Sequence, residues 1–211
     1  MHPNPVFHTG SDSENLTFAQ TRAFGQLSIN GDTAPLVAHA PFVLTEDAMT
    51  ADLHLMRSNP ITRALTKPLP ALLTVSGPDA YISPDWYDAP NQVPTWNYVA
   101  VHLRGRLELL DQSELPELLK RQSAAFEARL TPKPAWLMDK VDDAALARMM
   151  RMICPLRFHV ESVDSTWKLG QNKPDTARLG AANQLETGFG QDLSALASLM
   201  REIPDKKAVQ K

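Results

Sequence analysis

The stretch TWNYVAVHLRGRLEL, residues 95–109, decides the fold class of this chain. Its apolar and polar side chains alternate: Val99, Val101, Leu103, Leu107 and Leu109 share one parity, and Tyr98, His102, Arg104, Arg106 and Glu108 share the other. A period of two is typical of a strand with one buried face. Gly105 interrupts the apolar parity, which indicates a bulge or a bend in a barrel. We therefore expect one long strand over residues 95–109.

Further strands are expected on both sides of this segment. Upstream they cover residues 24–29, 36–44, 52–56, 71–75 and 80–83, and downstream residues 156–163 and 167–169. The turn signal Asn30-Gly31-Asp32 separates the first two, and Ser76-Gly77-Pro78-Asp79 separates the fourth and fifth. Helical spacing predicts helices over residues 111–130, 142–152 and 192–203, a polar arm with a short helix over residues 1–20, and a frayed tail over 205–211.

Strands that come as a run, with helices inserted late, favour an antiparallel barrel or sandwich over a parallel sheet. The predicted fold is therefore mainly β with inserted helices. A chain of 211 residues suits one large domain or two small ones and can bury a sizeable core without disulfides. We expect a single domain over residues 1–211.

Composition excludes several classes of protein. The net charge of -3 and the pI of about 6.1 give no overall attraction to nucleic acid or anionic lipid. The single cysteine, Cys154, fits a reducing compartment, and we see neither a secretory signal nor an apolar run long enough to span a membrane. We therefore expect a cytoplasmic protein. No phosphate-loop, dinucleotide, nucleophile-elbow or zinc-ligand motif is present, and we expect no metal site.

The segment Leu53–Arg63 suggests a phosphate site. A strand ends there and a helix begins, with Asn59 as N-cap and Pro60 at the first helical position. Free N–H groups at a helix start attract anions, Arg57 can add a bidentate charge, and Ser58 can add a hydroxyl. The alternative is an ordinary capped helix beside a surface arginine.

Three other clusters carry polar or aromatic groups. Residues 76–87 interleave aromatic rings with small polar residues, which either flank a flat ring or form a turn and a core strand. On the next strand Thr95 and Asn97 face one way, suited to a heterocycle's edge, and Trp96 faces the other. Residues 167–173 place two cations and two amides after a strand, where they either meet an anionic ligand or form a solvated turn.

Taken in order, these clusters resemble the PaiB family. The motifs are Ala38-His39-Ala40-Pro41-Phe42, His54-Leu55-x-Arg57-x-Asn59-Pro60, Tyr81-Ile82-Ser83-Pro84-x-Trp86-Tyr87, Val93-Pro94-Thr95-Trp96-Asn97-Tyr98 and Lys168-Leu169-x-Gln171-Asn172-Lys173. That family is described as FMN-binding negative transcriptional regulators. The resemblance implies a split β-barrel similar to pyridoxamine phosphate oxidase and the flavin reductases, and a homodimer whose two flavin sites receive residues from both subunits.

The resemblance also implies roles for particular residues. Arg57, Ser58 and Asn59 would hold the FMN phosphate, and His39 would lie on a strand bordering the flavin. The isoalloxazine ring or ribityl chain would be approached by Ser83, Thr95, Trp96 and Asn97. The late strand would contribute Lys168, Gln171, Asn172 and Lys173, with the partner subunit as one source. The family commonly has serine where this chain has Gly170, so one hydroxyl is lost there.

Three functions remain open from the sequence. The first is a flavin-binding regulator, for which we expect no strong direct contact with DNA because no basic recognition helix is evident. The second is an FMN-dependent oxidoreductase, in which the cofactor supplies the electron chemistry. No residue stands out as a general acid or base for it, and His39, His54 and Tyr98 are candidates only if they lie over the flavin ring. The third and least favoured is a haem-binding barrel, which requires an axial histidine.

Overall fold

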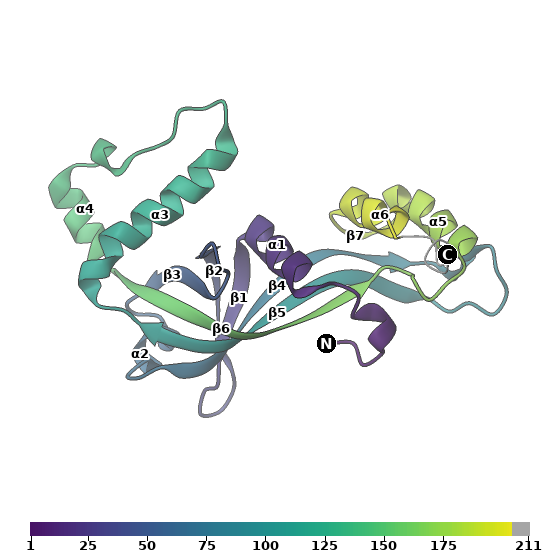
Figure 1. Cartoon of the computed structure of the whole chain (residues 1–211), viewed down its shortest axis with the longest axis horizontal. Coiled ribbons are helices and arrows are strands. Elements are labelled where there is room, and N and C mark those ends of the chain that lie inside the picture. The colour runs from purple at the N-terminus through teal and green to yellow at the C-terminus, as the bar shows by residue number, and fades with distance from the viewer. Residues whose placement is uncertain (204–211) are drawn as a thin grey trace. The chain divides into compact units, whose positions relative to one another are not determined.

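The computed structural model describes residues 1–203, which form two compact units (Figure 1). The barrel unit consists of Leu16–Val75 and His102–Val163. The terminal unit consists of Met1–Asn15, Ser76–Val101 and the described residues from Asp164 onward. Neither unit is one continuous stretch of sequence. The single domain over 1–211 stays a prediction, and the predicted frayed tail lies outside the described residues.

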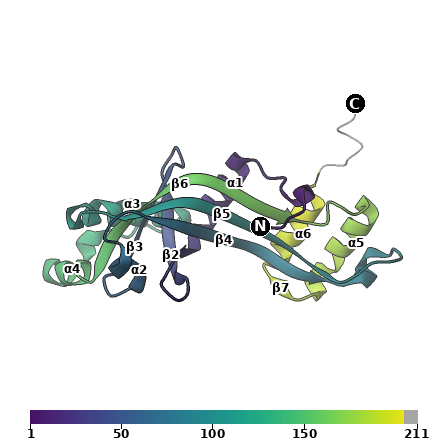
Figure 2. The same ribbon diagram turned by 90° about the horizontal axis from the view of Figure 1, so that it is seen from below.

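The barrel unit is built from six antiparallel strands. They are β1 (Phe24–Ile29), β2 (Leu36–Leu44), β3 (Thr50–Met56), β4 (Leu69–Ile82), β5 (Thr95–Leu109) and β6 (Ile153–Lys168). Their order is β1-β2-β3-β6-β5-β4, and β4 pairs back to β1 from Gln26↔Thr74 to Ile29↔Ala71, so the ring of strands closes. Figure 2 shows β4, β5 and β6 running side by side; each of these strands continues from the barrel unit into the terminal unit. The prediction of an antiparallel barrel is confirmed.

Alternation along β5 builds the core as predicted up to Leu107, whereas Leu109, expected on the same buried face, is 44% exposed. Its buried positions are Asn97, Val99, Val101, Leu103, Gly105 and Leu107. Other strands of the barrel unit also contribute fully buried side chains, among them Leu27, Leu53, Leu73, Leu156 and Phe158. Gly105 also lies on the buried parity, and a Cβ there would overlap the carbonyl oxygen of His159. Glycine is therefore required at this position because the backbones of β5 and β6 approach each other closely.

Two strand predictions were wrong in the same way. Residues 76–79 do not form a turn, because β4 runs through them without a break, and β6 likewise joins the two strands expected over 156–163 and 167–169. The first part of β4 pairs with β1, and Asp79–Ala80 pair with β7 (Gly190–Gln191). Pro78 lies between these two paired parts. A residue without an N–H is tolerated at such an interruption of the ladder. Strand pairing here overrides the local turn signal.

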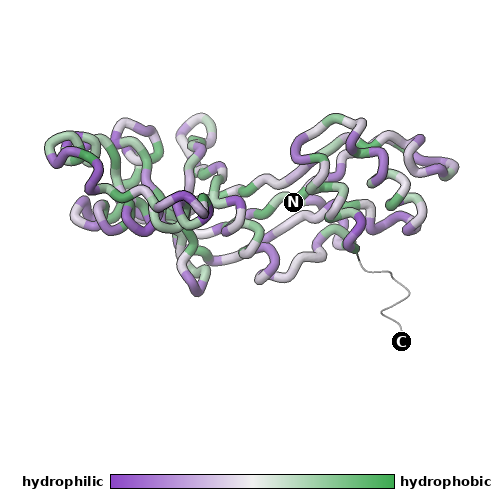
Figure 3. The backbone as a smooth tube through the Cα atoms, turned by 90° about the horizontal axis from the view of Figure 1, so that it is seen from above, coloured by the Kyte–Doolittle hydropathy of each residue, from purple (hydrophilic) through white to green (hydrophobic). Residues whose placement is uncertain are grey.

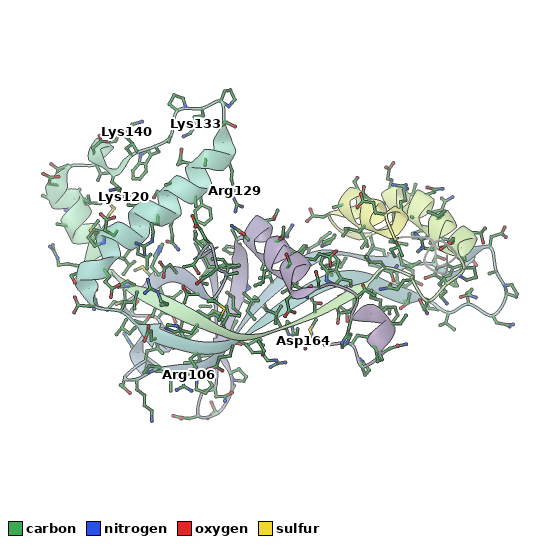
Figure 4. The ribbon with its side chains drawn as sticks, in the orientation of Figure 1. Arg106, Lys120, Arg129, Lys133, Lys140 and Asp164 are labelled. Carbon is green, nitrogen blue, oxygen red and sulfur yellow. The ribbon has the colours of Figure 1, made fainter. Side chains whose placement is uncertain are left out.

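The helices of the barrel unit follow their sequence signals closely. They are α2 (Pro60–Ala64), α3 (Leu115–Glu127), α4 (Asp143–Met150) and three short 3₁₀ turns at Gln112–Glu114, Ala128–Leu130 and Met138–Lys140, and α1 (Asp12–Arg22) contributes its second half. At the end of α3, the guanidinium of Arg129 points toward α1, where it donates hydrogen bonds of 2.7 and 2.8 Å to the carbonyls of Gln20 and Thr21 (Figure 4). A cation at a helix C-terminus satisfies free carbonyls there.

The terminal unit combines the ends of three long strands with helices. Its elements are the 3₁₀ turns Pro5–Phe7, Pro84–Tyr87 and Leu185–Thr187, the strand β7, and the helices α5 (Asp175–Gln184) and α6 (Leu193–Arg201). Sequence analysis missed α5, whose buried residues are the three alanines Ala177, Ala181 and Ala182 together with Arg178. Figure 3 shows hydrophilic and hydrophobic residues alternating along the traces of both units. None of the helices up to residue 203 combines the length and hydropathy needed to cross a bilayer.

Candidate functional site

A cavity of about 220 Å³ in the terminal unit gathers polar groups from three separate parts of the sequence. Its lining residues are His2, Asn4, Phe7, Tyr87, Val93, Thr95, Asn97, Lys168, Gly170, Asn172 and Lys173. Five of the predicted site residues are among them: Thr95, Asn97, Lys168, Asn172 and Lys173. Two larger hollows, along residues 84–92 and 186–195, are more open to solvent and have no cation in their lining. The smaller cavity is therefore the candidate site of this unit.

The two lysines are the charged groups of this cavity. The ammonium of Lys168 donates to Thr95 Oγ1 at 2.5 Å and lies 5.8 Å from the ring centre of Phe7. That of Lys173 donates to Gln92 Oε1 at 2.5 Å and lies 5.0 Å from the ring centre of Tyr87. Within residues 1–203 neither ammonium pairs with a carboxylate. Burial, and secondarily the charge of Lys173, lower the pKa of Lys168. The cavity thus carries uncompensated positive charge.

The turn after β6 holds these lysines in place. Gln171 is buried, and its side chain accepts a 2.8 Å hydrogen bond from Leu169 N and donates to the carbonyl oxygen of Trp167. Gly170 has a φ of +83°, a left-handed conformation that favours glycine, and its carbonyl accepts from Lys173 N at 2.9 Å. A serine at this position would be strained in this backbone. Gln171, which was predicted to contact the cofactor, therefore holds the turn through both ends of its amide in this structure.

The N-terminal arm forms one wall of the cavity, which sequence analysis did not foresee. The backbone N–H of His2 donates to Thr166 Oγ1 at 3.0 Å, and His2 Nδ1 accepts from Asn4 N at 3.1 Å. Phe7 is buried, with its ring at right angles to that of His2. Burial, followed by the charge of Lys168, lowers the pKa of His2. No local motif could reveal this wall, because it depends on a contact across 164 residues.

Two buried polar side chains face the cavity without a strong partner. Tyr87 is 2% exposed, and its hydroxyl has no hydrogen-bond partner among the described residues. Burial raises the pKa of Tyr87, which keeps the hydroxyl protonated. Asn97 is 1% exposed, and its only side-chain hydrogen bond within residues 1–203 is a 3.5 Å contact from Nδ2 to the thioether sulfur of Met200. Both side chains line the cavity, so their polar groups are available to a molecule bound there.

Two predicted residues of the terminal unit lie outside this cavity. Trp96 points to the opposite face of β5, where it is 42% exposed and packs edge-on against Tyr81 and Phe189 with ring centres 6.3 and 5.4 Å apart. Ser83 precedes the 3₁₀ turn Pro84–Tyr87, and its side chain makes no capping hydrogen bond. The structure therefore brings neither into the cavity with Thr95 and Asn97.

The predicted phosphate cluster lies in the barrel unit. Asn59 is the N-cap of α2, its Oδ1 accepting from Ile61 N at 2.9 Å, and Pro60 is the first helical residue, as predicted. The Nε of Arg57 donates to Arg151 O, and its Nη2 donates to Gln112 Oε1 and Ile153 O. Its Nη1 has no acceptor within residues 1–203. The side chain is therefore held in place with one nitrogen free for a ligand.

The remaining predicted residue, His39, lies on the outer side of β2. It is exposed, pairs in register with Gln26 on β1, and stacks on Phe24 with ring centres 6.4 Å apart. In the part of the chain that the structure describes, no three His, Cys, Asp or Glu side chains gather as a metal site would require.

Comparison with known proteins points to one family. Residues 1–162 match the model of a family described as "Putative FMN-binding domain". Over 204 residues the chain is 29% identical to "Protease synthase and sporulation protein PAI 2" of Bacillus subtilis (strain 168), covering 96% of this chain and 97% of that protein. The resemblance to PaiB drawn from the motifs is thereby confirmed.

Solved structures support the fold. The chain is similar to the FAD and heme binding protein from Mycobacterium smegmatis, with a TM-score of 0.54 and 14% identity, covering 75% of this chain and 71% of that one. It is also similar to a conserved hypothetical protein, Rv2991, from Mycobacterium tuberculosis, with a TM-score of 0.51 and 14% identity over 80% of this chain and 91% of the other. At these identities the likeness concerns the fold alone.

Proposed function

This chain belongs to the family of FMN-binding domains that it matches over residues 1–162, and from that premise we propose how it holds FMN and what it does. FMN is the cofactor, and the protein is of the PaiB type. When bound, FMN supplies electron-transfer chemistry, and the protein supplies binding, orientation and electrostatics. The proposal assigns those tasks to the residues described above.

The FMN phosphate is assigned to Arg57 and Ser58. The Arg57 guanidinium is held by hydrogen bonds through Nε and Nη2, which leaves Nη1 to donate to a phosphate oxygen without further ordering of the side chain. Charge-assisted hydrogen bonds of this kind are about twice as strong as neutral ones. Ser58 is exposed next to it and adds a hydroxyl. Asn59 contributes by starting α2, because its side-chain oxygen is occupied by Ile61 N.

The other predicted residues are proposed to contact the flavin. The convergence of Thr95, Asn97, Lys168, Asn172 and Lys173 on one cavity is the observation that carries this part. His39, Ser83 and Trp96 are retained from the family resemblance as contacts to the ring or ribityl chain. Gln171 is assigned a supporting role, since both ends of its amide hold the turn that carries the lysines.

The proposed biological role is a negative transcriptional regulator that works as a homodimer in the cytoplasm. The PaiB resemblance drawn from the motifs supports the regulatory role, and the buried lone Cys154 fits a reducing compartment. The net charge of -3 argues for an indirect route, in which the ligand state biases contact with a partner rather than with DNA. The family resemblance is the support for the homodimer.

Titration with FMN tests the cofactor assignment. Purified protein is mixed with FMN, and quenching of flavin fluorescence reports the fraction bound, while light scattering after gel filtration gives the mass of the flavin complex. A saturable complex of twice the 23.4 kDa chain mass is expected. Absence of quenching at millimolar FMN contradicts the cofactor assignment, and a complex of monomer mass contradicts the dimer. Rapid bleaching of the bound flavin by NADPH shifts the assignment to an oxidoreductase.

A further inference from the structure

We infer that Gln112 is a positioning residue for the FMN phosphate, and that it couples the helical segment of the barrel unit to the flavin. The helical segment is the stretch between β5 and β6, residues 110–152, which contains α3 and α4 (Figure 1). The inference rests on the proposed assignment of the phosphate to Arg57, and it adds a residue that acts through Arg57.

The guanidinium of Arg57 lies where the two ends of the helical segment meet. Near the start of the segment, Gln112 Oε1 accepts from Arg57 Nη2 at 2.7 Å. At its other end, the carbonyl of Arg151 accepts from Nε at 3.0 Å, and that of Ile153, the first residue of β6, accepts from Nη2 at 3.4 Å. The direction of the guanidinium, and therefore of its remaining nitrogen Nη1, depends on both ends of the segment.

The side-chain amide of Gln112 ties these two ends together. While its Oε1 accepts from Arg57, its Nε2 donates to the carbonyls of Met150 and Ile153 at 3.1 and 3.2 Å. A reversed amide would turn its NH₂ group toward the guanidinium, which has only donors, and its oxygen toward the two carbonyls, which only accept. One orientation alone satisfies all these partners, and it presents an acceptor to Arg57.

The backbone that carries Gln112 is held independently of this side chain. The 3₁₀ turn that begins at Gln112 is capped by Asp111, whose Oδ1 accepts from Ser113 N at 2.9 Å and from Ser113 Oγ at 2.6 Å. Just before the turn, Leu110 N donates to Pro155 O at 3.0 Å. A substitution at position 112 should therefore leave the turn in place and remove only the contacts of the amide.

The acceptors of Arg57 orient its charge without neutralising it. They are two backbone carbonyls and one amide oxygen, and no carboxylate of the described chain forms an ion pair with this guanidinium. The carbonyls lie at the C-terminal end of α4, where a positive charge is favourable. A glutamine at position 112 leaves the full charge of Arg57 for a phosphate, whereas a glutamate would compete with the phosphate for it.

The C-terminal end of α4 depends on the same hydrogen bonds. No side chain of α4 is buried, so apolar packing contributes little to the position of this helix. The carbonyls of Met150 and Arg151, at its end, accept from Gln112 and Arg57. Coupling between two sites is reciprocal. If the attached end of α4 orients Arg57 for a phosphate, a bound phosphate stabilises the attachment of α4.

Flavin fluorescence titrations with FMN and riboflavin test the positioning role. Gln112→Ala should weaken FMN binding roughly three- to ten-fold, as loss of one hydrogen bond does, and should leave riboflavin affinity within about two-fold of wild type. Gln112→Glu should weaken FMN binding at least as much, because its carboxylate pairs with Arg57. The matched control is Gln20→Ala, the same substitution at an exposed residue of α1 in the barrel unit, which should behave as wild type.

Two results of these titrations overturn the inference. One is an FMN affinity that neither Gln112 variant changes. The other is an equal loss of affinity for FMN and riboflavin, which would show that Gln112 supports the fold rather than the phosphate site. Circular dichroism and riboflavin binding together report whether each variant is folded.

A double-mutant cycle separates an action through Arg57 from a direct one. In the Arg57→Gln background, Gln112→Ala should have no further effect on FMN affinity, because the guanidinium that it positions is absent. Additive losses would show that Gln112 acts independently of Arg57, and would overturn the inference.

Hydrogen exchange measures the coupling to the helical segment. In wild type, FMN should slow amide exchange in α4 (Asp143–Met150) more than riboflavin does, and this difference should disappear in Gln112→Ala. Equal protection of α4 by the two flavins in wild type contradicts the coupling.

The same variants separate this inference from the proposed function. If Arg57→Gln leaves FMN affinity unchanged, the phosphate assignment fails and the inference fails with it. If Arg57→Gln weakens FMN binding selectively while Gln112→Ala and Gln112→Glu do not, the phosphate assignment stands and the inference alone is overturned.

Discussion

The backbone of Gly105 in β5 lies so close to the carbonyl oxygen of His159 in β6 that a methyl group at position 105 would overlap it. Gly105→Ala is therefore expected to destabilise the protein by about 2–3 kcal/mol, because the two strands must move apart within a packed barrel. Urea denaturation followed by circular dichroism measures the change. The control is Arg104→Ala, at the neighbouring exposed position, which should change stability by less than about 0.5 kcal/mol. Equal effects of the two would show that the strands are not held at this distance.

The ion pairs of Asp52 are expected to make the stability of the barrel unit sensitive to acid. Burial alone would raise the pKa of its carboxyl group, but hydrogen bonds from Arg157 at 2.8 Å and Arg121 at 2.6 Å lower it below the ordinary value of 3.8. A lowered pKa in the folded state gives stability that is complete above pH 3.8 and is lost as the pH falls through the lowered value.

Asp52→Asn is expected to cost about 3 kcal/mol at pH 7, because it leaves the guanidinium groups without their charge partner. The variant should also lose part of the wild-type decline in stability below pH 4. Urea denaturation at several pH values measures both effects. Arg121→Gln should cost less, because the side chain of Arg121 is 51% exposed. Parallel pH profiles for Asp52→Asn and wild type would contradict this account.

Asn59 is expected to act chiefly as a helix cap. Its Oδ1 accepts from Ile61 N at 2.9 Å, and loss of such a cap costs about 0.5–2 kcal/mol. Asn59→Ala should therefore destabilise the flavin-free protein by this amount in urea denaturation. Asn59→Asp keeps the acceptor and should stay close to wild type. If Asn59→Ala has no effect without flavin but weakens FMN binding, the residue contacts the cofactor instead.

Arg57 is expected to recognise the phosphate of FMN and no other part of it. Arg57→Gln should weaken FMN binding roughly 10- to 100-fold, as loss of a charge-assisted hydrogen bond does, and should leave riboflavin binding unchanged. Flavin fluorescence titrations with both ligands give the ratio of the two affinities. Lys120→Gln, which removes an exposed charge elsewhere in the barrel unit, is the control. An equal loss for FMN and riboflavin would show that Arg57 acts through the fold rather than through the phosphate.

The strands that sequence analysis located correctly are those in which buried positions alternate. For β1, β2 and β5 the predicted and observed limits agree, and every second residue is buried along most of each strand. The errors in β4 and β6 have a common cause. Residues such as Gly77 and Pro78 favour turns locally, and only the pairing of β4 with β1 and β7 keeps the strand extended. That pairing depends on residues distant in sequence.

The candidate site could be predicted only in part, because some of its residues follow from spacing along a strand and others from contacts distant in sequence. Thr95 and Asn97 were identified because their spacing places them on one side of a strand, and Lys168 and Lys173 because they flank a turn that follows one. His2 and Phe7 reach the cavity through a hydrogen bond between His2 and Thr166, which no spacing rule encodes. Tyr87 belongs to one of the sequence motifs, but the motif alone does not show that its side chain lines the cavity.

The passage of β4, β5 and β6 through both units has a practical consequence for dissecting the protein. A polypeptide ended at residue 162, where the family match stops, would cut β6 within its length and remove Lys168 and Lys173. The remainder would expose the unpaired edge of β5, and open edges of this kind promote aggregation. Isolated halves are therefore poor reagents for assigning activities, and point substitutions in the intact chain are the sounder route.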